Sequence, residues 1–164
     1  MGLGRTGLAA ARALHQSGAK VLVWDDDIEK RKHLKDVTIV DLTAADFSDI
    51  ETLILSPGIP HNYPVPHSVI LRAQAGGTEI ISDIEVLVRT QRDAGYIGVT
   101  GTNGKSTTTA LIRHIFKKNG LQVEAGGNFG VPALALNAID QAGFYVLEMS
   151  SYQLELTHSA NFEV

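Results

Sequence analysis

The 164-residue sequence contains no cysteine. This absence excludes a disulfide framework, thiolate zinc sites and cysteine nucleophiles. The sequence also lacks any apolar run near the roughly 20 residues that a membrane-spanning helix needs, and no basic-then-apolar leader opens it. We therefore expect a cytoplasmic protein that does not contact a membrane.

The sequence has fewer basic than acidic residues. Lys and Arg total 14 against 18 Asp and Glu, for a formal net charge of −4, and neither half of the chain is strongly basic. Because binding through nucleic-acid phosphates needs a basic surface, we expect no nucleic-acid partner. The 5 prolines and 16 glycines show no collagen-like period, and 44% hydrophobic residues indicate a globular protein.

Short apolar runs of strand length alternate with helical stretches. We expect helices at 6–17, 68–75, 83–92, 106–119 and 132–139, and strands at 20–24, 37–40, 52–55, 79–81, 96–99, 121–125 and 144–149. Strands separated by helices of this length favour parallel sheets built from βαβ units, so the predicted fold class is α/β. The helix near 84–92 is the expected join between two domains, 1–83 and 84–164.

Both ends of the sequence suggest a fragment. A glycine-rich turn at 2–7 normally follows a buried strand, yet only Met1 precedes it here. Residues 161–164 resemble the start of a further strand. We expect that the first strand is missing and that the remaining sheet has exposed apolar edges and an open slot where this strand would lie. We also expect the fragment to unfold partly or to aggregate.

The first motif with possible chemistry is Gly2, Gly4 and Gly7, spaced G-x-G-x-x-G, with the acidic run 25–27 after the next strand. Such a turn brings backbone amides and a helix N-terminus close to a phosphate, while a carboxylate accepts sugar hydroxyls. The alternative is a plain βα turn with a solvated acidic loop. The motif does not specify which nucleotide binds.

The second motif is Gly-Val-Thr-Gly-Thr-Asn-Gly-Lys-Ser-Thr at 98–107, between a strand and a helix. In a phosphate-binding loop Lys105 would bridge the β and γ phosphates, Ser106 would hold Mg²⁺, and the amides of 102–105 would line the cradle. The strict pattern requires glycine where Val99 stands, so the loop is a variant. The alternative is a glycine-rich helix start with a surface lysine.

The third motif begins at Glu148, directly after the apolar strand. Parallel sheets bind ligands at the carboxyl ends of their strands, where Glu148 could reach a Mg²⁺ held by Ser106. Alternatively, Glu148 caps the following helix, with Ser150 and Ser151 as turn residues. His61 and His67 flank a proline-rich loop, which we interpret as a rigid connector.

These residues resemble the Mur ligases, the amide ligases that build the peptidoglycan stem peptide. The ATP loop at 101–107 is the strongest match. Four further stretches follow in the family's order: Gly-Leu-Gly-Arg-Thr-Gly at 2–7, Ser-Pro-Gly-Ile-Pro at 56–60, Gly-Gly-Asn-Phe-Gly at 126–130 and Glu-Met-Ser-Ser-Tyr-Gln-Leu-Glu at 148–155. They are most similar to the members that join D-glutamate to UDP-N-acetylmuramoyl-L-alanine.

The resemblance implies a Rossmann-like domain at 1–83, which holds the UDP part of the substrate, and part of a P-loop-type ATPase domain at 84–164; a C-terminal domain is absent. The implied UDP contacts are Arg5, Thr6, Asp25, Asp26, Ser56, Pro57 and Gly58. The implied ATP contacts are Gly101, Thr102, Asn103, Gly104, Lys105, Ser106 and Thr107. Ser106 and Glu148 would bind Mg²⁺, Lys105 and Glu148 would be catalytic, and Asn128, Ser150 and Gln153 would face the substrate.

The implied reaction uses ATP and Mg²⁺. The alanyl carboxylate takes the γ-phosphoryl group to form an acyl phosphate, and the amine of D-glutamate then displaces phosphate. The family resemblance further implies peptidoglycan synthesis in the cytoplasm by an enzyme that is a monomer when full length. We expect the fragment to be inactive alone.

Two other hypotheses stay open on the sequence. An NAD-dependent oxidoreductase would explain the turn at 2–7 and the acidic run 25–27, although it leaves the Lys105 loop unexplained. A non-catalytic nucleotide-binding module would account for the short chain.

Overall fold

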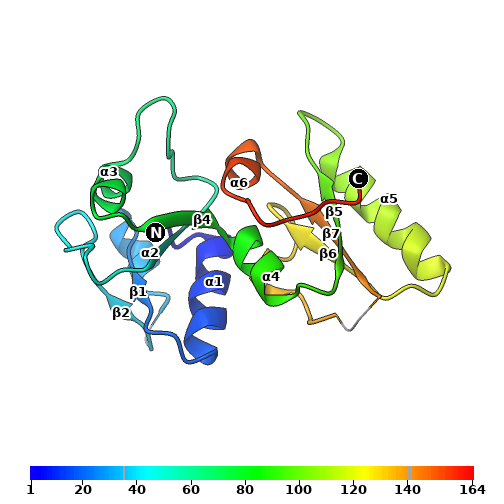
Figure 1. Ribbon diagram of the computed structural model, residues 1–164, viewed down its shortest axis with the longest axis horizontal. Helices are drawn as coiled ribbons and strands as arrows, with labels where there is room; N and C mark the ends of the chain where they lie inside the picture. The colour runs from blue at the N-terminus through cyan, green and yellow to red at the C-terminus, as the bar shows by residue number, and fades with distance from the viewer. Residues whose placement is uncertain (35, 140–141) are drawn as a thin grey trace. The chain divides into compact units, whose positions relative to one another are not determined.

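Every strand pair that the structure describes is parallel. The computed structural model describes residues 1–34, 36–139 and 142–164. It divides into two compact units, Met1–Asp83 and Ile84–Val164, and most of their helices and strands are labelled in Figure 1. Helices accompany the strands in both units, which confirms the predicted α/β class with parallel sheets.

The first unit contains two pairs of strands. Its elements are α1 (Arg5–Gln16), β1 (Leu22–Val23), α2 (Ile28–Arg31), β2 (Thr38–Ile39), β3 (Thr52–Leu55), α3 (Ser68–Ala75) and β4 (Glu79–Ser82). Strand β1 pairs with β2, and β3 pairs with β4. Each short apolar run predicted as a strand in this half therefore forms one, although β1 and β2 are reduced to two residues each.

Residues at the start of the chain connect these two strand pairs. The Met1 amine donates to the Ile54 carbonyl at 2.9 Å, and the Ser56 amide donates to the Met1 carbonyl at 3.0 Å. This is the hydrogen-bond pattern of parallel strands. The Gly2 amide donates to the Trp24 carbonyl at 2.8 Å, just beyond β1. Met1 and Gly2 thus lie between the carboxyl ends of β1 and β3.

The second unit is a three-stranded sheet with helices on it. Helix α4 (Asp83–Thr90) starts at the boundary, followed by β5 (Gly95–Val99), α5 (Lys105–Lys118), β6 (Val123–Gly127), a 3₁₀ turn (Ala133–Ala135), β7 (Phe144–Glu148) and α6 (Ser151–Glu155). The strand order is β5-β7-β6, so β7 is central. Residues 145–147 are fully buried, as expected for a strand with neighbours on both edges and side chains packed on both faces.

Two apolar clusters cover the faces of this sheet. On one face, Ile112 and Phe116 of α5 pack against Ile97, Val99 and Val146. The other cluster joins side chains of α4 to side chains of β5 and β7. It includes Ile84, Leu87 and Val88 from α4, Tyr96 from β5, and Tyr145 and Leu147 from β7. Helices on both faces explain why the strand sequences here are continuous apolar runs rather than alternating ones.

The predicted helix at 132–139 is wrong. Only Ala133–Ala135 turns, as a 3₁₀ helix, and Leu136 is already extended. Tertiary contacts compete with the helix in this segment: the Asn137 carbonyl accepts from the Tyr145 hydroxyl at 2.9 Å, and the Asn137 side-chain Nδ2 donates to Glu124 Oε1 at 3.0 Å. These hydrogen bonds hold the segment against β6 and β7, and the segment does not form an α-helix.

The expected strand start at the end of the chain is present in outline. Phe162 forms an isolated parallel bridge with Tyr96, and the Glu163 amide donates to the Tyr96 carbonyl at 2.9 Å. Among the described helices, none combines the length and the apolar character that crossing a membrane requires.

Candidate functional site

The loop between β5 and α5 has the backbone of a phosphate cradle. Gly101 and Gly104 have φ values of +132° and +79°, which side-chain-bearing residues rarely adopt. Gly104 is the N-cap of α5 and offers no side-chain cap, and the first turn of α5 carries no acidic residue. The uncapped amides and the positive end of the helix dipole therefore suit an anion, as the sequence predicted.

Lys105 lies over this loop. Its Nζ donates to the Gly101 carbonyl at 2.7 Å and is 3.5 Å from that of Thr102. An ammonium group has three donors, so these contacts place the charge at the loop without exhausting its capacity. Asn103 and Thr107 are exposed on the same loop and first helical turn. The structure thus brings the predicted ATP-binding residues together in one place.

Ser106 and Glu148 meet across 42 positions of sequence. The Ser106 hydroxyl donates to Glu148 Oε2 at 2.7 Å, and Glu148 is only 5% exposed at the end of the central strand β7. Carboxylate and hydroxyl oxygens are ligands that suit Mg²⁺, which typically takes one or two carboxylates and completes its shell with water and substrate phosphates. The described residues hold no group of three or more His, Cys, Asp or Glu that could bind a metal by itself. The Ser106 hydroxyl and the Glu148 carboxylate therefore suit a Mg²⁺ ion that also binds the phosphate oxygens of a ligand.

A second glycine-rich loop closes on the same strand end. Gly127, with φ +113°, approaches Glu148 so closely that a Cβ there would run into the Glu148 carbonyl. The Asn128 amide donates to that carbonyl at 2.8 Å. Asn128 is therefore beside Glu148, and its substrate contact stays a prediction.

Ser150 and Gln153 are engaged with each other in a capping box at the start of α6. The Gln153 amide donates to the Ser150 hydroxyl at 3.2 Å, and the Ser150 amide donates to Gln153 Oε1 at 3.2 Å. Gln153 is 1% exposed. The N-cap is thus Ser150 and not Glu148, which leaves the carboxylate facing Ser106. Substrate contacts of Ser150 and Gln153 stay predictions.

In the first unit, Asp25 anchors the glycine-rich turn. Its Oδ2 accepts from the Leu3 amide at 2.6 Å, and its Oδ1 accepts from the Asp27 amide at 2.9 Å. Burial raises the pKa of Asp25, but these two amides and nearby Lys30 outweigh it and hold the pKa below its usual value. The structure thus bonds the Asp25 carboxylate to backbone amides, and the predicted contacts of Asp25 and Asp26 with UDP stay predictions.

The other predicted nucleotide contacts surround the same turn. The Ser56 hydroxyl donates to the Gly2 carbonyl at 2.9 Å, and Pro57 and Gly58 continue as a turn after β3. Arg5 is exposed at the first position of α1, whereas Thr6 is buried. Their contacts with UDP stay predictions.

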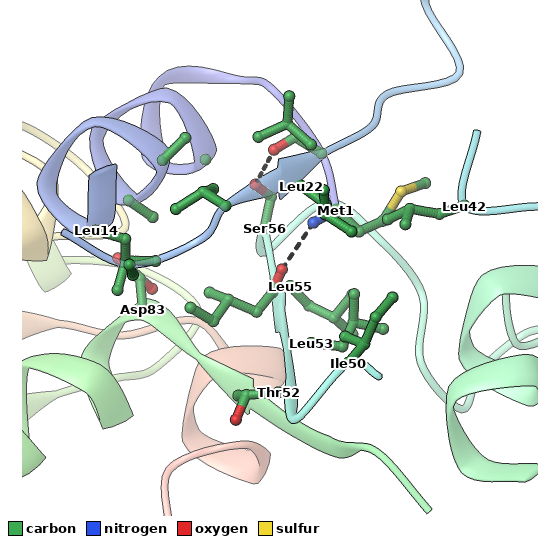
Figure 2. Close-up of a pocket in the computed structure, with 18 of the residues that line it drawn as sticks. Met1, Leu14, Leu22, Leu42, Ile50, Thr52, Leu53, Leu55, Ser56 and Asp83 are labelled. Carbon is green, nitrogen blue, oxygen red and sulfur yellow. Dashed lines mark hydrogen bonds between the residues drawn. The ribbon is translucent and has the colours of Figure 1, made fainter. Parts of the chain in front are cut away.

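A cavity of about 730 Å³ lies behind the turn (Figure 2). It is lined by β1, β3, one face of α1 and Met1–Leu3, with Leu22, Leu53 and Leu55 among its apolar walls. Burial lowers the pKa of the Met1 amine to about 6, against the opposing charge of Asp25. This space lies between the two parallel strand pairs of the unit, and the expectation that a strand is missing there stays a prediction.

Sequence reasoning missed two polar residues. Glu85 is fully buried and accepts hydrogen bonds from Arg89, His158 and Ser159. The sequence signal that could have identified Glu85 is an acidic residue on the apolar face of the helix predicted at 83–92. His67, interpreted as part of a connector, contacts Asp26 at 2.8 Å, and no sequence signal distinguishes it from a solvated histidine.

Two family models match the chain. Residues 1–82 match the Mur ligase MurD-like N-terminal domain, and residues 99–164 match the Mur ligase middle domain. Both matches favour a ligase over the oxidoreductase hypothesis.

Curated relatives extend the similarity over nearly the whole chain. A UDP-N-acetylmuramoylalanine--D-glutamate ligase of Caulobacter sp. (strain K31) is 48% identical over 96% of this chain. Proteins of the same name from Phenylobacterium zucineum (strain HLK1) and Brucella abortus (strain 2308) are 47% and 44% identical over 99% and 98% of it. The chain spans 35–36% of the length of these three relatives.

A solved structure shares the fold. The UDP-N-acetylmuramate:L-alanyl-gamma-D-glutamyl-meso-diaminopimelate ligase from Neisseria meningitides superposes with a TM-score of 0.52 at 20% identity, covering 90% of this chain and 50% of the other.

Proposed function

Because the chain belongs to the Mur ligase family, we propose that it carries the nucleotide-binding part of an ATP-dependent ligase that adds D-glutamate to UDP-N-acetylmuramoyl-L-alanine. In this proposal the first unit holds the UDP part of the substrate and the second unit holds ATP with Mg²⁺. The complete reaction, in the cytoplasm and by a monomer, is proposed for a longer chain that supplies the remaining ligase segments.

The observation that carries the proposal is the Ser106–Glu148 contact beside the Lys105 loop. Phosphoryl transfer depends mainly on positioning and on neutralising charge. The uncapped amides at the start of α5 would bind the β and γ phosphates, and Lys105 would neutralise part of their charge. Ser106 and Glu148 would hold Mg²⁺, which supplies further charge stabilisation when bound.

In this mechanism, no side chain of the second unit needs to act as a covalent nucleophile. In this proposal the alanyl carboxylate of the substrate attacks the γ-phosphoryl group of ATP and releases ADP, and the amine of D-glutamate then attacks the acyl phosphate and releases inorganic phosphate. The protein's task is to orient these groups and to exclude water from the acyl phosphate.

The binding half of the proposal is tested with Glu148→Gln, which keeps an oxygen acceptor for Ser106 but removes the charge. We expect the affinity for ATP in the presence of Mg²⁺ to fall about tenfold or more, as for disrupted metal sites, while affinity without Mg²⁺ changes little. Titration of a fluorescent ATP analogue measures both. The matched control is Glu51→Gln, at an exposed carboxylate in the other unit. Equal Mg²⁺ dependence in Glu148→Gln and the unchanged chain would refute the assigned Mg²⁺ role.

The ligase half is tested in a chimera. The 164 residues replace the matching segment of the Caulobacter ligase, and phosphate release is followed with ATP, Mg²⁺ and UDP-N-acetylmuramoyl-L-alanine. We expect release that depends on D-glutamate and is lost with Lys105→Ala. A folded chimera that binds ATP but shows no D-glutamate dependence would contradict the assignment.

A further inference from the structure

The carboxylate of Asp26 is held at both oxygens by side chains from two separate segments. The Trp24 indole donates to Oδ1 at 3.1 Å, and His67 Nε2 lies 2.8 Å from Oδ2. The Asp26 side chain is 60% exposed, and an exposed aspartate normally samples several rotamers. Two simultaneous partners select one orientation at the carboxyl end of β1.

The hydrogen bonds of His67 define which of its nitrogens carries the proton. The Val69 amide donates to Nδ1 at 3.2 Å, so Nδ1 is the acceptor. In the neutral imidazole the other nitrogen then bears the hydrogen, and Nε2 donates to Asp26. His67 is also the N-cap of α3 and its side chain is 19% exposed. One residue therefore joins the start of α3 to the loop after β1.

The backbone of Asp26 is held as well. The Arg31 guanidinium lies over the Trp24 ring, 3.4 Å from its centroid, and donates to the carbonyls of Asp25 and Asp26. Asp25 in turn bonds the Leu3 amide of the glycine-rich turn. The position of Asp26 relative to that turn is thus determined through both main chain and side chain, which is the arrangement expected of a preorganised binding group.

The held carboxylate retains binding capacity. An ionised carboxylate has about four acceptor positions, and the two partners use two of them. The others can accept N–H or O–H groups from a ligand, and sugar hydroxyls are the partners of an acid at this place in a nucleotide-binding βα unit. We propose that His67 is a positioning residue that orients Asp26 to bind the nucleoside of the UDP-bearing substrate. This inference rests on the proposed function of the first unit.

The test separates orientation from helix capping. His67→Asn keeps an N-cap that can accept the Val69 amide, since asparagine is among the best N-cap residues, but its side chain is too short to place a donor where His67 Nε2 contacts Asp26. We expect the Kd for UDP to rise about fivefold, in line with the loss of one exposed charge-assisted contact. The Kd for inorganic pyrophosphate, which lacks the nucleoside, should stay unchanged, as should both constants in the control His33→Asn at an exposed histidine of the same unit.

A double-mutant cycle with Asp26→Ala completes the test, with both ligands measured by calorimetry on the full-length chimera with the Caulobacter ligase described above. If His67 acts through Asp26, His67→Asn has no further effect on UDP binding once Asp26 is removed. The inference is overturned if His67→Asn leaves the UDP constant unchanged, lowers UDP and pyrophosphate binding equally, or acts just as strongly without Asp26. If the folded chimera without substitutions fails to bind UDP but still binds ATP, the proposed function of the first unit is overturned and this inference with it.

Discussion

At the scale of single residues, Glu85 shows how a buried charge is stabilised. It is fully buried and accepts from Arg89 Nε at 2.7 Å, the His158 amide at 2.7 Å, and the Ser159 amide and hydroxyl at 2.9 and 2.6 Å. Burial raises the pKa of Glu85, but the hydrogen bonds from Ser159, Arg89 and His158 outweigh it and lower the pKa from 4.5 to about 2. The carboxylate ties residues 158 and 159 to α4.

This shift predicts acid sensitivity. Because the pKa of Glu85 is lower in the folded state than in the unfolded state, its stabilisation is complete above about pH 4.5 and is lost as pH falls toward 2. We expect the free energy of unfolding to drop by on the order of 3 kcal/mol across that interval. Urea unfolding followed by circular dichroism measures it. In Glu85→Gln the drop should be much smaller, whereas Glu51→Gln should behave like the unchanged chain; an identical slope in Glu85→Gln would disprove the assignment.

At the scale of elements, the glycine-rich turn has a close backbone approach at Gly7. A Cβ at Gly7 would run into the Gly2 carbonyl, whereas a Cβ at Gly4 would meet nothing within 4 Å. Gly4 also has an ordinary φ of −66°. The turn therefore requires glycine at position 7, where α1 packs against the first residues, for a steric reason that does not apply at position 4.

These two glycines offer a matched pair of variants. Gly7→Ala should destabilise the chain by roughly 2–4 kcal/mol, because α1 must move away from residues 1–3. Gly4→Ala should change stability by less than about 1 kcal/mol. Chemical denaturation gives both values, and a cost for Gly4→Ala as large as that for Gly7→Ala would contradict this account of the turn.

At the scale of the whole molecule, the first unit carries an apolar cavity of about 730 Å³ between two strand pairs. Met1 already bonds to β3 in parallel fashion, and its amine is buried with a pKa of about 6. A residue joined to Met1 would turn that amine into an amide N–H and direct further chain along β3 and β1. The unit therefore has both the space and the hydrogen-bonding edges for one more strand.

Adding about five Val and Ile residues ahead of Met1, roughly the length of a common strand, should stabilise the unit. We expect the melting temperature to rise by about 5 °C or more, because apolar side chains would fill the cavity and new ladder bonds would form. Five Gly and Ser residues are the control, since they also remove the buried amine. Thermal scanning decides between them: equal melting temperatures for the two extensions would show that the cavity does not accept a strand.

Much of the fold followed from local pattern. Apolar runs with period-appropriate spacing located β3 and α3 to the residue, because those segments have clear stop signals such as Gly76. The helix predicted at 132–139 did not form, because tertiary hydrogen bonds to Tyr145 of β7 and Glu124 of β6 hold Asn137, and local periodicity does not reveal such contacts. Short helices such as α6 were also beyond a periodicity argument, since five residues hold little more than one turn.

What the sequence by itself determined is the chemistry available: the glycine loop at 101–104 with its lysine, the acid after β7, the acids after β1, and the family these motifs indicate. Only the tertiary structure decided how those groups are used. It brought Ser106 to Glu148, bonded Asp25 to the Leu3 amide, and placed His67 against Asp26. The physical reason is that parallel strands gather their carboxyl ends at one edge, so partners tens of residues apart meet there, and which of them pair depends on packing that no local pattern encodes.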